Sequence, residues 1–411
     1  MTASRGPRTG TAVLERALLD ALDGAEELSR VELTEITGLS RTVVAALVGG
    51  LVERGEIAPV AHRPRPGAGR GRPSTVYRLN RSAPLVALVH LRRTRSVVTL
   101  ATSAGSVAEH TIGVPWPGPW EKWAEEALDV LEAAERAHGR AARRVVIAVP
   151  FTVDSAHGDR LMPLAGPAPA TPPGLPPYGP QPDPAFRDAL VQWHGDEPGP
   201  RLARLFRRPV HFANAANLAA LGEAHYGAAR GAAVAIHLSV CHGIGAGLVL
   251  GGELFTGASG TAGELAHVQV TEDGPYCPCG SRGCLAVQAP GPDPHTALER
   301  RYGRRLEPAE VDALVTDGHP VAVRFFHDFG RLTARSLAGT VTLLNPDTIV
   351  LDADLRCAAR PFGEGLSSAL ALHCPPSYTR DLRVVPGELH DALALGAVAT
   401  GQARDHARHR R

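Results

Sequence analysis

The chain has 411 residues, of which 44% are hydrophobic and 21% charged, a balance typical of a globular protein. Its formal net charge of +1 excludes a polyanion-binding surface spread over the whole molecule. The polar first residues lack the apolar core of a signal peptide, and no apolar run is long enough to span a membrane. We therefore expect a cytoplasmic protein with no membrane partner.

The first eighty residues predict a helix-turn-helix. The stretch "AVLERALLDAL" has the apolar spacing of an amphipathic helix, and in "LSRVELTEITG" Ser29 and Glu32 have the spacing of a capping box. Gly38 ends this short helix, and Ser40 is the expected N-cap of the next one, in "LSRTVVAALVGGLVERGEI". A stretch rich in Gly, Pro and Arg then leads to the strand-like "TVYRLN".

A run of positive charge adjoins these helices, because no Asp or Glu occurs between residues 57 and 108. The same span contains nine arginines: Arg63, Arg65, Arg70, Arg72, Arg78, Arg81, Arg92, Arg93 and Arg95. Such a run beside a helix-turn-helix is typical of a DNA-binding surface. The alternative is a flexible basic linker.

From residue 84 onward the pattern indicates an α/β body. Strands are predicted in "LVALVHL", "SVVTLAT", "RRVVIAV", "VAIHLSV", "GAGLVL" and "DTIVLDA", and helices over 120–139 and 322–344. Residues 163–184 are rich in proline and predict a loop.

A cysteine cluster lies in "GPYCPCGSRGC", residues 274–284, and His267 precedes its first cysteine by ten residues. Six cysteines in a chain of this length do not make a disulfide framework. In a reducing compartment the cluster predicts metal ligands, and the alternative is a set of free or buried thiols.

Together these motifs resemble the ROK family (repressor, open reading frame, kinase), and in particular its regulator branch. The resemblance rests on the helix-turn-helix with "GRGRP", on "NAANLAALGEA" (214–224), "GIGAGLVLGGELFTGASGTAGELAH" (243–267), the cysteine cluster and "LLNPDTIVL" (343–351). It implies a winged helix-turn-helix over residues 1–80 and, over 81–411, an α/β body of actin-like fold. The body's two ribonuclease-H-like lobes would span about 84–210, with the C-terminal helix, and about 211–390. The family's structural zinc ion maps to His267, Cys277, Cys279 and Cys284.

Sugar kinases of the family need a glycine-lined phosphate loop and a carboxylate base, and both are altered here. In "HLRRTR", residues 90–95, His90 replaces the family's Asp, and Arg92 and Arg93 replace glycines that let the backbone approach a phosphate. The position of the base is Ala215, which accepts no proton. We therefore expect no catalytic residue and no kinase activity.

The sugar-contacting positions of the family are only partly retained. Asn214, Glu264 and His267 are present, but the other two positions are Ala215 and Ala286. Each lost carboxylate contact removes roughly 1.5–3 kcal/mol. Three interpretations stay open: an effector that is less hydroxylated or differently shaped, a weakly bound sugar, or no ligand and a body that serves as an oligomerisation scaffold.

The resemblance also indicates how DNA would be read. Ser40, Arg41 and Thr42, at the start of the second helix, would enter the major groove. Arg70 and Arg72 in the wing suit an A·T-rich minor groove, or alternatively clamp phosphates without base preference. By resemblance alone we expect a homodimer or homotetramer on an inverted repeat of double-stranded DNA.

The sequence thus predicts a zinc-containing, DNA-binding transcriptional regulator with a degenerate kinase body, controlled by a sugar-like or other small-molecule effector. Two alternatives remain: a catalytic sugar kinase with an accessory DNA-binding domain, and an effector-independent oligomeric DNA-binding scaffold.

Overall fold

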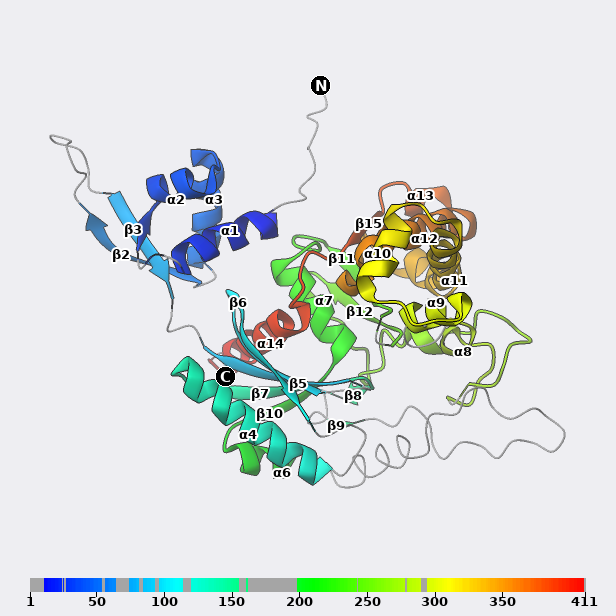
Figure 1. The fold of residues 1–411 in the computed structure, drawn as a ribbon, viewed down its shortest axis with the longest axis horizontal. Coiled ribbons are helices and arrows are strands. Elements are labelled where there is room, and N and C mark those ends of the chain that lie inside the picture. Colours follow the sequence, from blue (N-terminus) through cyan, green and yellow to red (C-terminus); the bar gives the residue numbers. More distant parts are fainter. Residues whose placement is uncertain are drawn as a thin grey trace.

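A computed structural model shows an N-terminal part of three helices and a small sheet, joined to a larger body (Figure 1). It describes residues 11–23, 25, 27–53, 56–63, 74–80, 84–92, 96–113, 120–154, 160–161, 198–241, 243–277, 279–289 and 294–409. The Pro-rich stretch expected to form a loop lies outside these residues. Within them, no single helix is both long and apolar enough to cross a bilayer; α2 and α3 reach that length only when taken together, across a bend of 116°.

The N-terminal part has the helix ends that the sequence predicts. Its elements are α1 (Thr11–Asp23), β1 (Leu28–Ser29), α2 (Arg30–Thr37), α3 (Arg41–Glu53), β2 (Ile57–Arg63) and β3 (Ser74–Leu79), with strand order β1-β3-β2. The capping box is present: the backbone N–H of Ser29 donates to Glu32 Oε2 (2.6 Å), and that of Glu32 donates to Ser29 Oγ (3.3 Å). Gly38 ends α2 at φ 68°, a conformation that glycine adopts at least cost. Apolar side chains of all three helices form a separate small core.

The first lobe of the body is a five-stranded sheet between helices. Its strands are β4 (Val86–Leu91), β5 (Ser96–Thr102), β6 (Gly105–Ile112), β7 (Arg144–Val149) and β10 (Val210–Asn214), in the order β10-β7-β4-β5-β6. Alternate residues of β4 face opposite sides: Val89 packs towards α4 (Trp120–His138) and α6 (Pro198–Phe206), and Leu88 packs towards α7 (Ala215–Tyr226) and α14 (Ala392–His409). The first sheet thus includes β10, which ends at Asn214, a few residues past the expected lobe boundary near 210. A short hairpin of β8 (Val153–Asp154) and β9 (Arg160–Leu161) adjoins it.

The second lobe repeats this sheet. Its strands are β11 (Val234–Ser239), β12 (Gly245–Leu250), β13 (Glu253–Leu254), β14 (Thr348–Leu351) and β15 (Arg383–Pro386), in the order β13-β12-β11-β14-β15. In both sheets the first strand is central, two antiparallel strands follow on one side, and two parallel strands lie on the other. The remaining helices are α8 (Leu285–Gln288), α9 (Pro294–Tyr302), α10 (Pro308–Thr316), α11 (Pro320–Leu344), α12 (Ala359–His373) and α13 (Pro376–Thr379). The long pair α11 and α12 covers one face of the second sheet around a shared apolar core.

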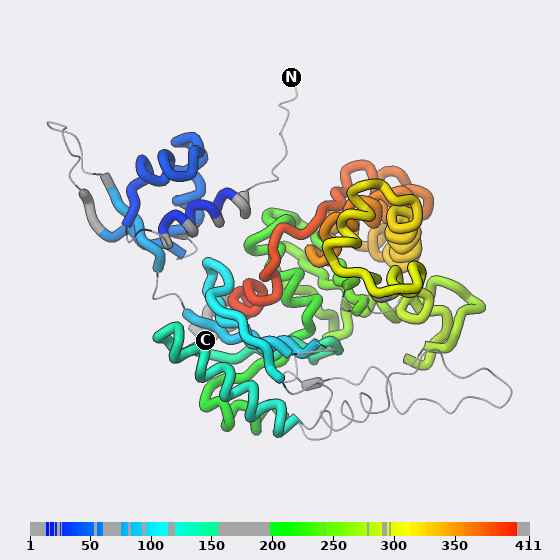
Figure 2. The backbone as a smooth tube through the Cα atoms, in the orientation of Figure 1, coloured from blue at the N-terminus to red at the C-terminus, as the bar shows by residue number. Residues whose placement is uncertain are grey.

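Helix α7 joins the two lobes. On one side it packs against α14, which returns at the end of the chain to the first sheet (Figure 2). On the other side its small residues pack against the second sheet. Close approach is possible because glycines lie at the contacts: a Cβ on Gly222 would strike the backbone of Ala392, and a Cβ on Gly247 would strike Ala220.

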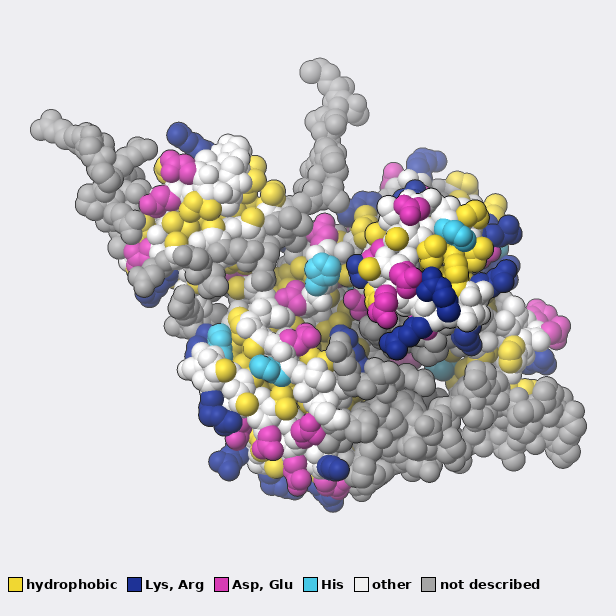
Figure 3. All heavy atoms as spheres, viewed as in Figure 1, with side chains coloured by type: hydrophobic (Ala, Val, Ile, Leu, Met, Phe, Trp, Pro, Cys, Tyr) yellow, Lys and Arg dark blue, Asp and Glu magenta, His cyan; other side chains and the backbone are white. Residues whose placement is uncertain are grey.

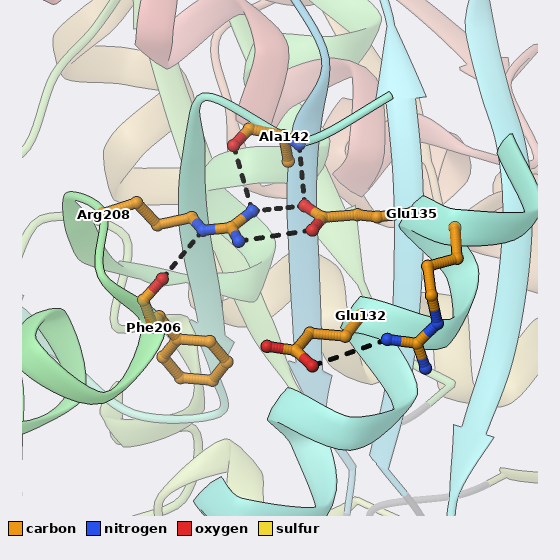
Figure 4. A network of polar contacts seen from close by, with 6 residues as sticks. Glu132, Glu135, Ala142, Phe206 and Arg208 are labelled. Carbon is orange, nitrogen blue, oxygen red and sulfur yellow. Dashed lines mark hydrogen bonds and ion pairs between the residues drawn. The ribbon is translucent and has the colours of Figure 1, made fainter. Parts of the chain in front are cut away.

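A partly buried ion pair fixes the outer edge of the first lobe (Figure 4). The guanidinium of Arg208 binds the carboxylate of Glu135 through both terminal nitrogens, and also donates to the carbonyls of Ala142 (3.0 Å) and Phe206 (2.9 Å). The N–H of Ala142 donates to the same carboxylate at 2.7 Å. One charge pair therefore holds the end of α4, the turn into β7 and the turn between α6 and β10.

Replacing Glu135 by Gln should destabilise the protein by about 2–4 kcal/mol, because the largely buried Arg208 would lose its counter-charge. Urea unfolding followed by the fluorescence of Trp120 and Trp123 in α4 measures this loss. The matched control is Glu132→Gln, which breaks an exposed pair with Arg136 in the same helix and should cost less than about 0.5 kcal/mol. Equal unfolding midpoints for the two variants would contradict this account.

Candidate functional site

The histidine and three cysteines singled out in the sequence form one cluster. The ligand atoms of His267, Cys277, Cys279 and Cys284 all lie within 4.8 Å of one another. Sγ of Cys277 is 3.5 Å from Nδ1 of His267, and the Sγ atoms of the other two cysteines are 3.7 Å apart. This donor set, three sulfurs and one imidazole nitrogen, could hold a metal ion.

Glycines allow the chain to fold this tightly. The backbone N–H of Cys277 donates to the carbonyl of Ser281 (2.8 Å), which closes a small loop around Gly280 at φ 94°. Gly283 has φ 63°, and a Cβ there would strike the carbonyl of Thr271. Glycine is thus required at position 283 on two counts, conformation and space.

Burial sets the protonation of the cluster. It raises the pKa of the Cys277 thiol to about 12 and raises that of Cys284. It also lowers the pKa of His267, against a smaller opposing effect of Glu264. Thiolates at this place therefore need a compensating positive charge, which a bound dication supplies.

The other two residues expected to contact an effector already have partners within the chain. Oε1 of Glu264 accepts a hydrogen bond from Oγ1 of Thr152 (2.8 Å), which joins the two lobes. Asn214 caps α7 by accepting from the N–H of Asn217 (3.2 Å), and its Nδ2 donates to the carbonyl of Phe151 (3.2 Å). Thr152 was not predicted, and its partner lies 112 residues away in the sequence.

A cleft between the lobes forms a cavity of about 170 Å³. Its lining includes Arg92, Ala215, Glu223, His237, Asp352 and His390. Asn214 also lines it, but Glu264 and His267 do not. The cleft thus contains the positions that the resemblance assigned to the phosphate loop and the catalytic base.

Asp352 accepts hydrogen bonds from three backbone N–H groups in this cleft. Its Oδ2 accepts from the N–H groups of Val240 (3.0 Å) and Cys241 (3.2 Å), and its Oδ1 accepts from that of Asp354 (3.0 Å). Beside it His237 is 5% exposed, and its Nδ1 has no partner in the described part of the chain. Burial lowers the pKa of His237, and the nearby Asp352 carboxylate opposes that shift.

Glu223 is a second buried carboxylate on the cleft wall, which the sequence analysis missed. It is 1% exposed, and its two oxygens accept from the N–H groups of Ala228 (2.7 Å) and Leu389 (3.1 Å). Burial raises its pKa to about 7, and the two backbone donors only partly offset this. An acidic residue among the small apolar residues of "NAANLAALGEA" was the available signal.

The exposed start of α3 is the candidate nucleic-acid interface. Ser40, Arg41 and Thr42 are all exposed, whereas Val44 and Val48 point into the small core. Oγ of Ser40 accepts from the N–H of Val43 (3.4 Å), as the predicted N-cap requires. The wing residues Arg70 and Arg72 lie outside the described residues. On the face of the body in Figure 3, acidic and basic side chains are interspersed among the described residues.

Comparison with known proteins gives the family. The ROK family profile matches residues 191–399, which is more than half of the chain. The chain belongs to the ROK family.

Its ROK relatives include both kinases and regulators. A glucokinase from Thermotoga maritima is 30% identical over 233 residues, or 52% of this chain and 72% of that enzyme. A predicted xylose repressor from Caldicellulosiruptor sp. is 25% identical over 391 residues, or 90% of this chain and 91% of that protein. Other curated repressors match over only about half of their own length, 47% and 50% in two cases.

A solved ROK structure has the same fold over almost the whole chain. It is a ROK family transcriptional regulator, a homologue of the E. coli MLC protein. The TM-score is 0.61 at 20% sequence identity, and the match covers 96% of each chain. At this identity the likeness establishes the fold alone.

We expect Cys277→Ser to abolish metal binding, because the cluster would lose one of four ligands. Elemental analysis of the purified protein should find about one metal ion per wild-type chain and a small fraction of that in the variant. The control is Cys357→Ser, which changes an exposed cysteine outside the cluster. A fully folded Cys277→Ser protein with its metal content intact would overturn the assignment.

Glu223 should make stability fall as the pH rises. Its folded pKa of about 7 lies above its ordinary value of 4.5, so its contribution is complete below about pH 4.5 and is lost as the pH rises through 7. Relative to Glu223→Gln, the wild type should therefore lose about 2–3 kcal/mol between pH 5 and pH 8. Urea unfolding at several pH values measures the difference. The same comparison with the exposed Glu132→Gln should be flat, and a flat result for Glu223→Gln would refute the raised pKa.

Proposed function

We propose that this ROK protein is a DNA-binding transcriptional regulator whose body lacks kinase activity. The observation that carries the proposal is the N-terminal part, which stands before the ROK body and exposes the start of α3. Similarity along the chain supports it: the predicted xylose repressor matches 90% of the chain, and the glucokinase 52%. A regulator of this kind would act in the cytoplasm, where its DNA is.

The proposed DNA-binding domain is a winged helix-turn-helix within residues 1–80. The bend of 116° between α2 and α3 falls in the range usual for such helix pairs. Ser40, Arg41 and Thr42 would meet the major groove, and Arg41 is the one long donor among them. Arg70 and Arg72 are proposed as wing contacts to the minor groove or to phosphates. The operator would be an inverted repeat bound by a homodimer or homotetramer, since two-fold protein symmetry pairs with a palindromic site.

Loss of kinase activity is supported by three features of the cleft. Ala215 stands where a base is needed, and the bulk of Arg92 lines the place where phosphates would approach backbone. Asp352 also places a negative charge on the backbone donors that follow β11. Arg92 and Asp352 would weaken nucleotide binding, and Ala215 would remove the base from the catalytic step.

The proposed metal is one zinc ion with a structural role. Three cysteines and one histidine leave no ligand position open for a substrate or a water molecule, as is typical of structural zinc. The ion would hold the loop 274–284 against η2 (Leu265–His267), and so fix Glu264, which bonds to the first lobe.

A sugar-like or other small-molecule effector is proposed as the control signal. Relatives are named as repressors of N-acetylglucosamine and xylose, which supports a carbohydrate ligand class. At the family's sugar position, a hydroxylated ligand would compete with the bonds that Asn214 and Glu264 already make. Ordinary hexoses should therefore bind weakly there.

A kinase with an accessory DNA-binding domain is the second candidate, because the Thermotoga maritima glucokinase is matched over 72% of its length. Incubation with ATP and a panel of hexoses should release no ADP above the blank. The Thermotoga enzyme serves as the positive control. Steady turnover that survives repurification would favour the kinase.

Arg41→Ala should weaken operator binding by about 1–3 kcal/mol, roughly five- to a hundredfold, because it removes the long donor at the start of α3. Fluorescence anisotropy at fixed salt measures the affinity. The control is Arg324→Ala, an exposed arginine on α11 of the body, which should bind as the wild type does. Equal affinities for the two variants would remove α3 from the interface.

A further inference from the structure

Arg92 brings a positive charge into the interlobe cleft. Its Nε donates to Nδ1 of His90 at 3.1 Å, which fixes the plane of the guanidinium. Its two terminal nitrogens make no hydrogen bond or ion pair within the part of the chain that the structure describes. A guanidinium held in this way is suited to bind an oxyanion through two parallel N–H donors.

Two carboxylates of the cleft, in contrast, already have donors. Both oxygens of Glu223 accept from backbone N–H groups, and so do both oxygens of Asp352. Because these two carboxylates already accept hydrogen bonds from the backbone, they do not need Arg92 as a partner. Among the described residues of the cleft, Arg92 is therefore a cationic group with donors to offer a ligand. The cavity, at about 170 Å³, is slightly larger than a cavity that accepts benzene, so it holds a molecule of about one ring.

One wall of the cleft is also tied to the N-terminal part. Leu389, His390 and Ala392 line the cavity, and Asp391 between them accepts through Oδ2 from the N–H of Ser106 (2.8 Å). Ser106 belongs to the β5–β6 hairpin, and Ala104 at the tip of that hairpin packs against the core of the N-terminal part.

A second link runs beside the first. Arg230, just after α7, binds Glu15 of α1 at 2.8 Å, and Glu15 is 6% exposed. The charge of Arg230 also acts on Glu388, the neighbour of cavity-lining Leu389. A shift of this wall would therefore act directly on the Asp391–Ser106 hydrogen bond and, through the charge of Glu388, on Arg230, which binds Glu15 of α1.

We propose that the interlobe cleft is an effector site for a small organic oxyanion, bound through Arg92 and sensed by the N-terminal part through the segment 387–392. The site overlaps the family's sugar position at Asn214 and Ala215, which line this cavity, but extends away from Glu264 and His267, which do not. The expected effect of the ligand on operator affinity rests on the proposed regulator function. The bound group is a phosphate or a carboxylate, because each presents a pair of oxygens that can accept two parallel N–H bonds from a guanidinium.

Ligand binding is tested on the full-length protein without DNA. Thermal unfolding is followed with inorganic phosphate, with glucose 6-phosphate, with gluconate and with glucose. At least one anion should give a saturable rise in Tm while glucose gives none, and the two organic anions distinguish a phosphate from a carboxylate. Arg92→Gln should weaken that response at least tenfold, whereas Arg136→Gln, an exposed arginine of α4, should leave it unchanged. No anion response, or an equal response in Arg92→Gln, would overturn the site.

The link to DNA is tested with Asp391→Ala, which removes the acceptor for Ser106. The stabilising anion should change operator affinity severalfold in the wild type. In the variant it should still raise Tm but no longer change operator affinity. A variant whose DNA binding responds as the wild type does would overturn the link through this segment, and so would a wild type whose operator affinity ignores the anion. If no operator is bound at all, the regulator function fails, while the Tm measurements still decide the site.

Discussion

Helix α7 can lie between the two lobes only because its contacts are made by the smallest residues. Gly222 meets the backbone of Ala392 in α14, and Gly396 of α14 meets the backbone of Leu218. On the opposite face Gly247 of β12 meets Ala220. A methyl group at any of these glycines would push the neighbouring element away. The spacing of the lobes therefore depends on the absence of a side chain at these few positions.

Both ends of α7 are used to build the cleft. At its start Asn214 caps the helix and holds the carbonyl of Phe151, which leads to Thr152 and its bond with Glu264. Near its end Glu223 binds the N–H groups of two loops. One of these loops continues to α14 through Asp391, which accepts from the N–H of Ser106, and the other continues to Arg230, which binds Glu15 of the N-terminal part. A ligand that alters the cleft would therefore act on α7, which is connected through these loops to both contacts.

Local features of this fold were predictable and long-range ones were not. The capping box joins Ser29 to Glu32, three positions apart, and the turn joins the N–H of Gly38 to the carbonyl of Thr34, four positions apart. Such short-range pairs can be read directly from the sequence. The gathering of one histidine and three cysteines into one cluster was predictable for the same reason, since all four fall within residues 267–284. The bond of Thr152 to Glu264 and that of Asp352 to the N–H of Val240 each span 112 residues, and no local pattern marks them. In the fold Asp352 accepts hydrogen bonds from the backbone N–H groups of Val240, Cys241 and Asp354. The place of Arg92 on the cleft wall became visible only once the cleft was assembled, because the sequence shows a lost phosphate loop and not what replaces it.

The central claim is that the N-terminal part reads DNA sequence, and it is tested most directly by selecting bound fragments from a random pool with the purified full-length protein at physiological salt. The account predicts that an inverted repeat is enriched, with half-sites about one helical turn, or a multiple of it, apart. Binding that enriches no sequence and varies only with salt would contradict it, because a basic surface without base contacts behaves in that way.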